Sequence, residues 1–255
     1  MLFPSSRLPF QLFLQNHAVR HGAVSLREGI GLILDAEHRQ ILAARVLQCT
    51  LAIGSYSDDG TLAFPWYAFK YKQIQWFCPK RRFVIFPDEI HVSHSMRTLM
   101  NKHQYCVTFN TAFDQVIRGC STVDGRINEN GAWLGDDIID AYTKLHELGR
   151  ARSVEVWHGD DLVGGLYGVI SGTGFVGESM FSREPNTSKL ALIALARQMQ
   201  EHGGTLIDCQ IHTPHLESLG ARFISYKEYI DTLHGKDTYR TWQKMPLIMP
   251  NSFNA

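Results

Sequence analysis

Three apolar segments separated by tight turns constrain the fold of this chain more than any other feature of its sequence. They are Ser153–Trp157, Asp161–Ser171 and Phe175–Ser182. The first alternates in polarity, and the connections HGDD and GTG are typical of hairpin turns. The sequence therefore predicts three consecutive hairpin strands in one sheet.

The segments that follow alternate between helix and strand. After a polar loop, the apolar spacing predicts a long helix over Lys189–His202, which a glycine pair ends. Thr205–Gln210 is expected as a fourth strand, a short helix is expected near His215, and Phe223–Leu233 completes the pattern as a strand. This order of hairpin strands, helix, strand, helix and strand predicts an α+β fold.

The earlier part of the chain divides near Phe86–Pro87. Residues 1–86 are rich in aromatics and interrupted by Pro and Gly, with one helical pattern over Glu37–Leu51. From about residue 88 the pattern becomes regular, with an extended stretch at His91–Ser95, a strand at Tyr105–Phe109, and helices over Ser95–His103, Ala112–Gly119 and Trp133–Leu148. We therefore expect a small N-terminal domain over 1–86 and a larger domain over 87–255.

The charge balance limits how this chain can bind nucleic acid. Its 255 residues carry 25 Lys and Arg and 25 Asp and Glu, so the formal net charge is zero. Any RNA contact should therefore be a local basic patch on a neutral body. Candidate patches are Lys80–Arg82 and the pair Arg97 and Lys102, although each could equally be ordinary solvated surface.

The sequence lacks the common signatures of other classes. No signal-peptide pattern and no run of roughly 18 apolar residues is present, so we expect a cytoplasmic protein without a membrane partner. Five widely spaced cysteines without a CxxC pair favour free thiols over a zinc site or a disulfide framework. There is no GxxxxGK[ST], HExxH or GxSxG motif. The glycines of GGLYG lie inside a strand, where either a ligand or another backbone could approach closely.

Glu178 is an unusual residue for its position in the third strand. Strict alternation puts Glu178 on the same face as Val176 and Met180, while Phe175 and Phe181 point to the opposite face. If that face is buried, the carboxylate needs an ammonium or hydrogen-bond donors as partners. The alternative is that the face is solvated.

Asp208 raises the same question in the fourth strand. Asp208 and Gln210 share one face and alternate with Ile207 and Cys209. An Asp and a Gln two positions apart can bind each other and a common ligand, and the carboxylate could accept a proton or orient an amine. A structural Asp that caps a helix stays an equal alternative.

Several aromatic side chains could bind nucleobases. Exposed Trp side chains near basic residues stack on bases, whereas core packing is the alternative for each of them. The residues concerned are Trp66, Trp76, Phe77 and Trp133.

Several longer motifs of the sequence resemble those of a known protein family. SVEVWHGDDLVGGLYGVISGTGFVGESMFSREPNTSK, LIDCQ and HLESLGA closely resemble the leucyl/phenylalanyl-tRNA–protein transferase family. FPWY, HVSHSM, YCVTFNTAFDQVIRGC and AYTKLHELG extend the resemblance to most of residues 64–230. VGGLYGV, GESMFS and LIDCQ at these separations are highly specific.

The resemblance implies a fold, a reaction and partners. The fold is a small N-terminal α/β domain followed by a GNAT-like acyltransferase domain with a mixed sheet flanked by helices. The reaction moves Leu or Phe, and less readily Met, from aminoacyl-tRNA to proteins with N-terminal Lys or Arg, which marks them for N-degron degradation. No metal or cofactor is implied, because the tRNA ester supplies the activated acyl group, and we expect a monomer.

The resemblance also implies roles for individual residues. Asp208 and Gln210 match the family's proposed catalytic pair, and Glu178 matches a carboxylate near the aminoacyl ester. Trp66 in the small domain and Trp133 in the larger domain match aromatics that stack on the 3′-terminal adenosine of the tRNA. Arg97 and Lys102 make up the expected basic patch for the tRNA acceptor stem. The apolar pocket for the amino-acid side chain corresponds to Leu166, Phe175, Met180, Leu192, Leu195, Met199 and Ile207.

The chain departs from the family pattern in places that concern substrate choice. The family's GGDLS segment is missing, and its WWSPDPR reads WFCPKRR here. A basic pair appears as Asn101 and Lys102, and two larger aromatic pocket positions appear as Leu195 and Met199. We predict an unchanged chemistry with a pocket of different shape.

The sequence disfavours two other functions. An acyl-CoA-dependent acetyltransferase on the same fold needs a glycine-rich loop at a helix N-terminus to hold pyrophosphate, and SREPNTSK contains no glycine. A non-catalytic tRNA- or degron-binding protein is disfavoured because Glu178, Asp208 and Gln210 are all present.

Overall fold

The computed structural model describes residues 64–68, 73–77, 81–122, 127–128, 131–132 and 136–233. The chain divides into two units, Met1–Pro79 and Lys80–Ala255. The described part of the first unit is an antiparallel hairpin of β1 (Phe64–Ala68) and β2 (Gln73–Phe77). The helix predicted over Glu37–Leu51 lies outside the described residues.

The boundary between the units differs from the one predicted at Phe86–Pro87. It falls after Pro79 because the next strand, β3 (Arg81–Ile85), belongs to the large sheet of the second unit. There β3 pairs with two strands from the far end of the chain, β10 (Ile207–Asp208) and β11 (Arg222–Ser225). A strand of five residues next to a Pro–Lys connection gives no local sign of such distant partners.

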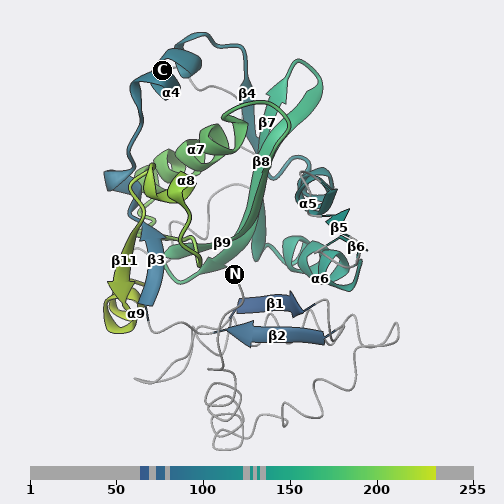
Figure 1. The fold of residues 1–255 in the computed structure, drawn as a ribbon, viewed down its shortest axis with the longest axis vertical. Coiled ribbons are helices and arrows are strands. Elements are labelled where there is room, and N and C mark those ends of the chain that lie inside the picture. The colour runs from purple at the N-terminus through teal and green to yellow at the C-terminus, as the bar shows by residue number, and fades with distance from the viewer. Residues whose placement is uncertain are drawn as a thin grey trace, which may run out of the picture. The chain divides into compact units, whose positions relative to one another are not determined.

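A mixed seven-stranded sheet forms the second unit, in the order β11-β3-β10-β9-β8-β7-β4 (Figure 1). The predicted hairpin strands are confirmed as β7 (Ala151–His158), β8 (Asp161–Ser171) and β9 (Gly174–Ser182). The sheet begins at its other edge with β4 (Cys106–Phe109). Every neighbouring pair is antiparallel except β9 and β10, which are parallel. The α+β class is therefore confirmed.

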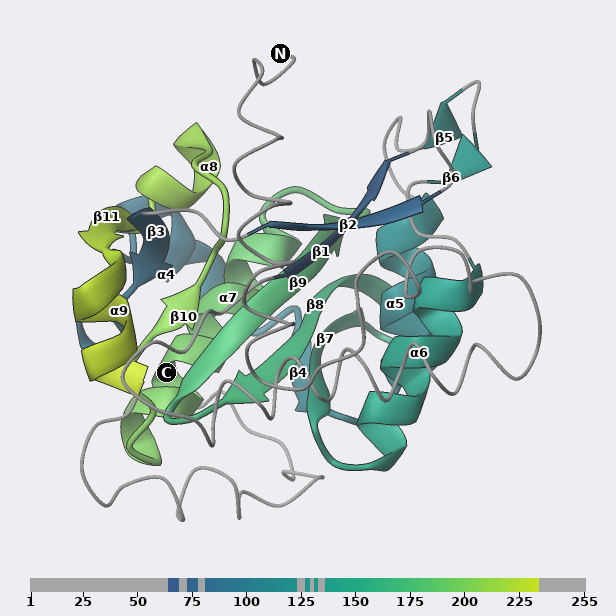
Figure 2. The ribbon, with the colours of Figure 1, turned by 90° about the horizontal axis from the view of Figure 1, so that it is seen from below.

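Helices cover both faces of the sheet, as Figures 1 and 2 show. On one face lies α7 (Thr187–Glu201), and on the other lie α5 (Phe113–Thr122) and α6 (Asp136–Glu147). The remaining short elements are η2 (Pro87–Glu89), α4 (His94–Asn101), β5 (Ile127–Asn128), β6 (Gly131–Ala132), α8 (Pro214–Glu217) and α9 (Tyr226–Leu233). Within the described ranges, no helix is long and apolar enough to cross a membrane.

The core lies between α7 and the sheet, and local sequence explains why α7 is central. Ten of its residues are buried, mostly Ala, Leu and Ile, so the helix is apolar on nearly all sides. It packs so closely on β8 that a Cβ added at Gly164 would lie 2.4 Å from the hydroxyl oxygen of Thr187. A Cβ at Gly168 would lie 2.2 Å from the carbonyl oxygen of Val176. The glycines of GGLYG therefore serve packing within the protein.

The prediction for the last segment is wrong in part. Only Arg222–Ser225 forms a strand, and the residues from Tyr226 onward form α9 rather than continuing the strand through Leu233. Tyr229 and Leu233 are both buried and stand four positions apart, which is the repeat of one helix face. That spacing was present in the sequence and outweighs the short alternation before it.

Candidate active site

Glu178 lies at a β-bulge in β9. Tyr167 of β8 pairs with Ser179, and the next residue, Gly168, pairs with Gly177, so Glu178 has no residue opposite it. A bulge of this kind re-aims a side chain and is frequent beside active sites. The strict alternation predicted for this strand is therefore interrupted at the carboxylate itself.

The bulge also changes which side chains of β9 share a face. Phe175 pairs with Ile170 and Met180 pairs with Leu166, and these two β8 residues lie on one face. Phe175 and Met180 consequently lie on the same face, whereas alternation predicted opposite faces for them. The corrected arrangement brings both residues to the side of the sheet that α7 covers.

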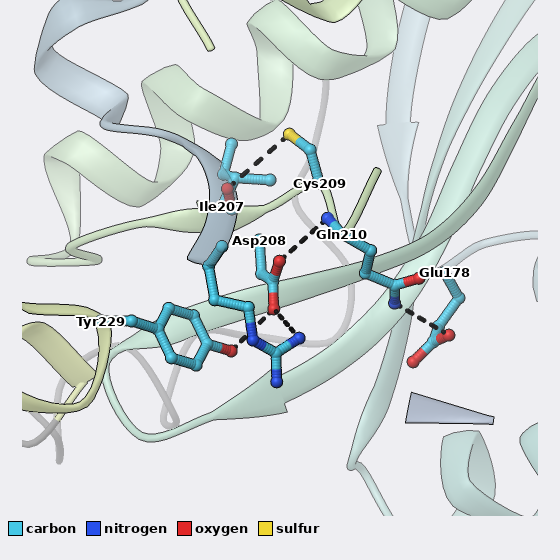
Figure 3. Close-up of polar contacts among 7 residues, drawn as sticks. Glu178, Ile207, Asp208, Cys209, Gln210 and Tyr229 are labelled. Carbon is cyan, nitrogen blue, oxygen red and sulfur yellow. Dashed lines mark hydrogen bonds and ion pairs between the residues drawn. The ribbon is translucent and has the colours of Figure 1, made fainter. Parts of the chain in front are cut away.

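Gln210 meets Glu178 where β9 and β10 separate. The two parallel strands pair only at Ile207 and Asp208, opposite Phe175 and Val176. Beyond that point the Gln210 side chain spans the gap, and its Nε2 donates a hydrogen bond of 3.3 Å to Glu178 Oε2 (Figure 3). A side-chain contact thus replaces the backbone ladder beyond the last paired residues.

Asp208 lies behind this pair, completely buried. Its Oδ2 accepts hydrogen bonds from Arg82 Nη1 at 3.1 Å and from the Tyr229 hydroxyl at 2.7 Å. Its Oδ1 accepts a hydrogen bond of 2.9 Å from the main-chain N–H of Gln210. The carboxylate is thus paired and hydrogen-bonded through both oxygens, which is the condition for a buried charge.

The electrostatics of the site raise the pKa of Glu178 to about 7, and desolvation is the largest cause. The hydrogen bond from Gln210 and the nearby Tyr142 hydroxyl oppose the rise. The charge of Asp208 adds to the rise, and that of Arg82 opposes it. Part of the Glu178 side chain is still accessible, so water moderates the shift without reversing its direction. Glu178 is therefore a carboxyl group that can gain and lose a proton near neutral pH.

Tyr142 of α6 borders Glu178 from below the sheet. Desolvation raises the pKa of its hydroxyl well above the ordinary value, and the Glu178 charge adds to the rise. The hydroxyl oxygen is buried and lacks a hydrogen-bond partner within 3.5 Å among the described residues. It is a donor that stays protonated beside the carboxyl group.

The apolar residues expected to form the pocket are mostly core residues. Met180 is partly exposed and packs against the edge of the core cluster, together with Cys209. The others are at most 3% exposed and pack in one cluster between α7 and the sheet: Leu166, Phe175, Leu192, Leu195, Met199 and Ile207. The structure thus brings all seven predicted pocket residues together, with Met180 nearest to the surface.

The remaining predicted residues lie elsewhere or outside the described part. Trp66 is in β1 of the first unit, paired with Gln75, and Trp133 is among the residues that are not described. Arg97 is exposed on α4, and Lys102 is exposed at the C-cap of that helix. In the described ranges, no group of three or more His, Cys, Asp or Glu side chains gathers in a way that could hold a metal ion.

Sequence reasoning missed the buried partners of the site. Arg82 was interpreted as part of a basic surface patch, yet it is 1% exposed. It alternates with Phe83 and Ile85 and shares a face with Val84, and only Arg81 at the start of the strand is exposed. A cation inside such a strand is a signal of a buried anion. Tyr229 carries no comparable signal.

The comparisons with known proteins identify the family of the chain. Residues 84–234 match the family model for leucyl/phenylalanyl-tRNA protein transferase. The chain belongs to this family. The match spans all three polar residues of the site and confirms the predicted resemblance, so the chain is a member of an enzyme family of transferases.

Individual members of the family are similar over about two thirds of the chain. The leucyl/phenylalanyl-tRNA–protein transferase of Shigella sonnei is 46% identical over 171 residues, which are 67% of this chain and 71% of that protein. That of Syntrophus aciditrophicus is 52% identical over 161 residues, 63% of this chain and 66% of that protein. That of Flavobacterium psychrophilum is 48% identical over 170 residues, 67% of this chain and 80% of that protein.

Among solved structures, L-PGS from Bacillus licheniformis aligns with a TM-score of 0.36 at 13% identity, covering 64% of this chain and 56% of that chain. A similarity at this level does not assign a fold family. The GNAT-like description of the larger unit therefore stays a prediction.

Proposed function

We propose that this protein transfers Leu or Phe, and less readily Met, from aminoacyl-tRNA to the α-amino group of proteins that begin with Lys or Arg. The observation that carries the proposal is the Gln210–Glu178 pair beyond the last paired residues of β9 and β10, in a member of the leucyl/phenylalanyl-tRNA protein transferase family. The products would enter N-degron degradation in the cytoplasm. The tRNA ester is already activated, so the proposal needs no cofactor.

The chemistry of the transfer requires a group that handles protons. The acceptor amine attacks the ester carbonyl carbon, an amide bond forms, the ester C–O bond breaks, and the terminal ribose hydroxyl leaves. The amine loses a proton and the ribose oxygen gains one. A carboxyl group with a pKa of about 7 can accept the first proton and supply the second, because catalytic groups work best near the operating pH. Glu178 is our candidate for this role.

Gln210 is suited to orient the acceptor amine beside Glu178. Since its Nε2 donates to the Glu178 carboxylate, its side-chain oxygen points elsewhere and can accept a hydrogen bond from the amine. Holding the amine beside the ester contributes a large part of the rate acceleration by proximity alone. Asp208 is fully buried, so its contribution would pass through Gln210 rather than through contact with the substrate.

The apolar cluster next to Met180 is the proposed place for the amino-acid side chain. Met180 forms the accessible edge of that cluster, and a flexible Met side chain adapts to differently shaped ligands. Apolar pockets distinguish one methylene by only about 1–3 kcal/mol, so modest promiscuity among Leu, Phe and Met is expected.

The tRNA itself would be bound by separate parts of the chain. We propose that residues 1–86 contribute to binding of the tRNA 3′ end. Trp66 of this segment and Trp133 would stack on the 3′-terminal adenosine. The exposed Arg97 and Lys102 would contact phosphates of the acceptor stem. The protein would act as a monomer with aminoacyl-tRNA and an acceptor protein as its partners.

The acyl-CoA alternative is disfavoured by the start of α7. Pyrophosphate binding there needs main-chain N–H groups that point outward. The N–H of Thr187 instead donates to the carbonyl oxygen of Glu184 at 3.3 Å, and the N–H of Ser188 donates to Ser182 Oγ at 2.9 Å. These first amides of the helix are already used within the protein.

The decisive test is a transfer assay with three labelled substrates. Leu-, Phe- and Met-tRNA are each mixed with the protein and with a peptide that begins with Lys or Arg, and label in the peptide is measured. A peptide with the same sequence and an acetylated N-terminus is the matched control. We expect label only with the free α-amine, and no label from any of the three tRNAs would disprove the proposed function.

A further inference from the structure

We infer that Arg82 and Tyr229 are positioning residues for the transfer reaction, because together they fix Asp208 so that it holds Gln210 against Glu178. We call Arg82, Asp208 and Tyr229 the Asp208 clamp. The inference rests on the proposed function where it concerns transfer. The clamp itself is a property of the fold and can be tested separately.

The clamp joins three elements that are far apart in the sequence. Arg82 comes from β3, Asp208 from β10 and Tyr229 from α9. Arg82 and Asp208 are 126 positions apart and are 1% and 0% exposed, and Tyr229 is also completely buried. None of the three is positioned to touch a substrate from solution. Apart from the effect of the Arg82 and Asp208 charges on the pKa of Glu178, their influence on the reaction would therefore pass through Gln210.

The two oxygens of Asp208 have separate tasks. Oδ2 receives both donors of the clamp, at 3.1 Å and 2.7 Å. Oδ1 then faces the main-chain N–H of Gln210, at 2.9 Å (Figure 3). Because a carboxylate is planar, fixing Oδ2 from two directions also fixes where Oδ1 points. Loss of one donor would let the carboxylate rotate.

Gln210 needs such support because its backbone is strained. Its φ of 61° lies in the left-handed region, which residues other than Gly, Asn and Asp seldom adopt. Such a conformation persists only when the surroundings hold it, and it is frequent at active sites. The hydrogen bond from its N–H to Asp208 is the contact that holds it, and the resulting geometry directs the side chain to Glu178.

Charge and packing keep the clamp in one state. The Arg82 guanidinium lies 4.7 Å above the centre of the Tyr229 ring, so the cation is in contact with the aromatic face as well as with the carboxylate. Burial and the Asp208 charge both raise the pKa of Tyr229 well above its ordinary value. The hydroxyl therefore stays protonated and donates across the physiological range.

The first experiment measures transfer by Tyr229→Phe, which keeps the ring under Arg82 and removes only the donor. We expect kcat to fall about tenfold, as the loss of a hydrogen bond to a charged group implies, with an unchanged KM for aminoacyl-tRNA. Tyr105→Phe, which removes a hydroxyl that donates to Glu184 just before the edge strand β4, is the control and should behave as wild type. Wild-type kcat in Tyr229→Phe would overturn the inference and leave the proposed function standing.

A double-mutant cycle separates positioning from a general loss of structure. If Tyr229 acts through Gln210, then Tyr229→Phe causes no further loss of kcat in a Gln210→Ala background. A merely structural role would lower kcat by the same factor in both backgrounds. Additive losses would therefore overturn the inference.

Hydrogen exchange of the Gln210 main-chain amide tests the clamp without any transfer assay. In Tyr229→Phe, and in Arg82→Lys with its charge retained, we expect this amide to exchange about tenfold faster, since its local opening becomes easier. Amides of α5 serve as internal controls. Unchanged exchange at Gln210 in both variants would refute the clamp. A wild-type protein that transfers no label would refute only the proposed function.

Discussion

At the scale of single residues, we expect Glu178 to determine how activity depends on pH. Its pKa is about 7 instead of 4.5, so the base form is populated only as the pH rises through 7. We expect the transfer rate to rise across that range, and Glu178→Gln to lose this limb together with roughly 100-fold in kcat. The pH–rate profile of kcat for both proteins is the measurement. A wild-type profile that is flat from pH 6 to pH 8 would contradict the role.

The same carboxyl group has an opposite effect on stability. A carboxyl with a raised pKa in the folded state favours folding when protonated, so stability falls as the pH rises from about 4.5 to about 7. We therefore expect Glu178→Gln to be more stable than wild type at pH 8 and similar to it at pH 4.5. Urea unfolding at the two pH values measures this difference. Equal shifts at both pH values would indicate that ionisation of Glu178 is not the cause.

Residue-level prediction selected three polar residues that the structure brings together, but it missed their buried partners. Glu178, Asp208 and Gln210 were identified from polar positions in apolar strands, and the structure brings them together. The bulge at Glu178 could not be predicted, because it depends on how β9 pairs with β8. The burial of Arg82 likewise depends on Asp208, which follows 126 positions later. Local pattern carries no information about either partner.

At the scale of elements, the contact between α7 and β8 sets the position of the apolar cluster. A Cβ at Gly164 would lie 2.4 Å from Thr187 Oγ1 and 2.5 Å from Thr187 Cβ. A rotamer change of Thr187 would not relieve this overlap, because it leaves the Cβ atom in place. We expect Gly164→Ala to reduce the free energy of unfolding by about 1–3 kcal/mol, the usual effect of overpacking. Urea denaturation measures it. An unchanged midpoint would show that the start of α7 moves aside freely.

Elements were predicted best where a single periodicity extends over many residues. The helix expected over Lys189–His202 is α7, Thr187–Glu201, and the three hairpin strands match their predicted ranges closely. Phe223–Leu233 failed because two elements meet there without a break, at Ser225 and Tyr226. A four-residue strand is too short for its alternation to be separated from the start of a helix.

At the scale of the whole molecule, the formal net charge is zero, so we expect tRNA affinity to depend on few cations. We expect the double variant Arg97→Ala, Lys102→Ala to bind aminoacyl-tRNA more weakly and to lower the slope of log affinity against log salt by about two. Lys227→Ala is the control, since Lys227 is exposed in α9 and pairs with Asp231. A slope identical to that of wild type would place the phosphate contacts elsewhere.

The whole-molecule organisation was predictable in outline from composition and motifs. The division into a small first unit and a larger second one was expected, but the boundary at Pro79 required knowledge of the partners of β3. The family model begins at residue 84, inside that strand. The share of the tRNA contacts made by residues 1–86 stays a prediction.

The Asp208 clamp has a consequence for the protein during its synthesis on the ribosome. Synthesis proceeds from the N-terminus, so Arg82 leaves the ribosome long before Asp208, and Tyr229 follows last of the three. Until α9 has emerged, Asp208 lacks the hydrogen bond from Tyr229. The orientation of Gln210, which depends on Asp208, is then less firmly held. If the clamp positions Gln210 as proposed, a nascent chain reaches its full transfer rate only after the final described helix has docked.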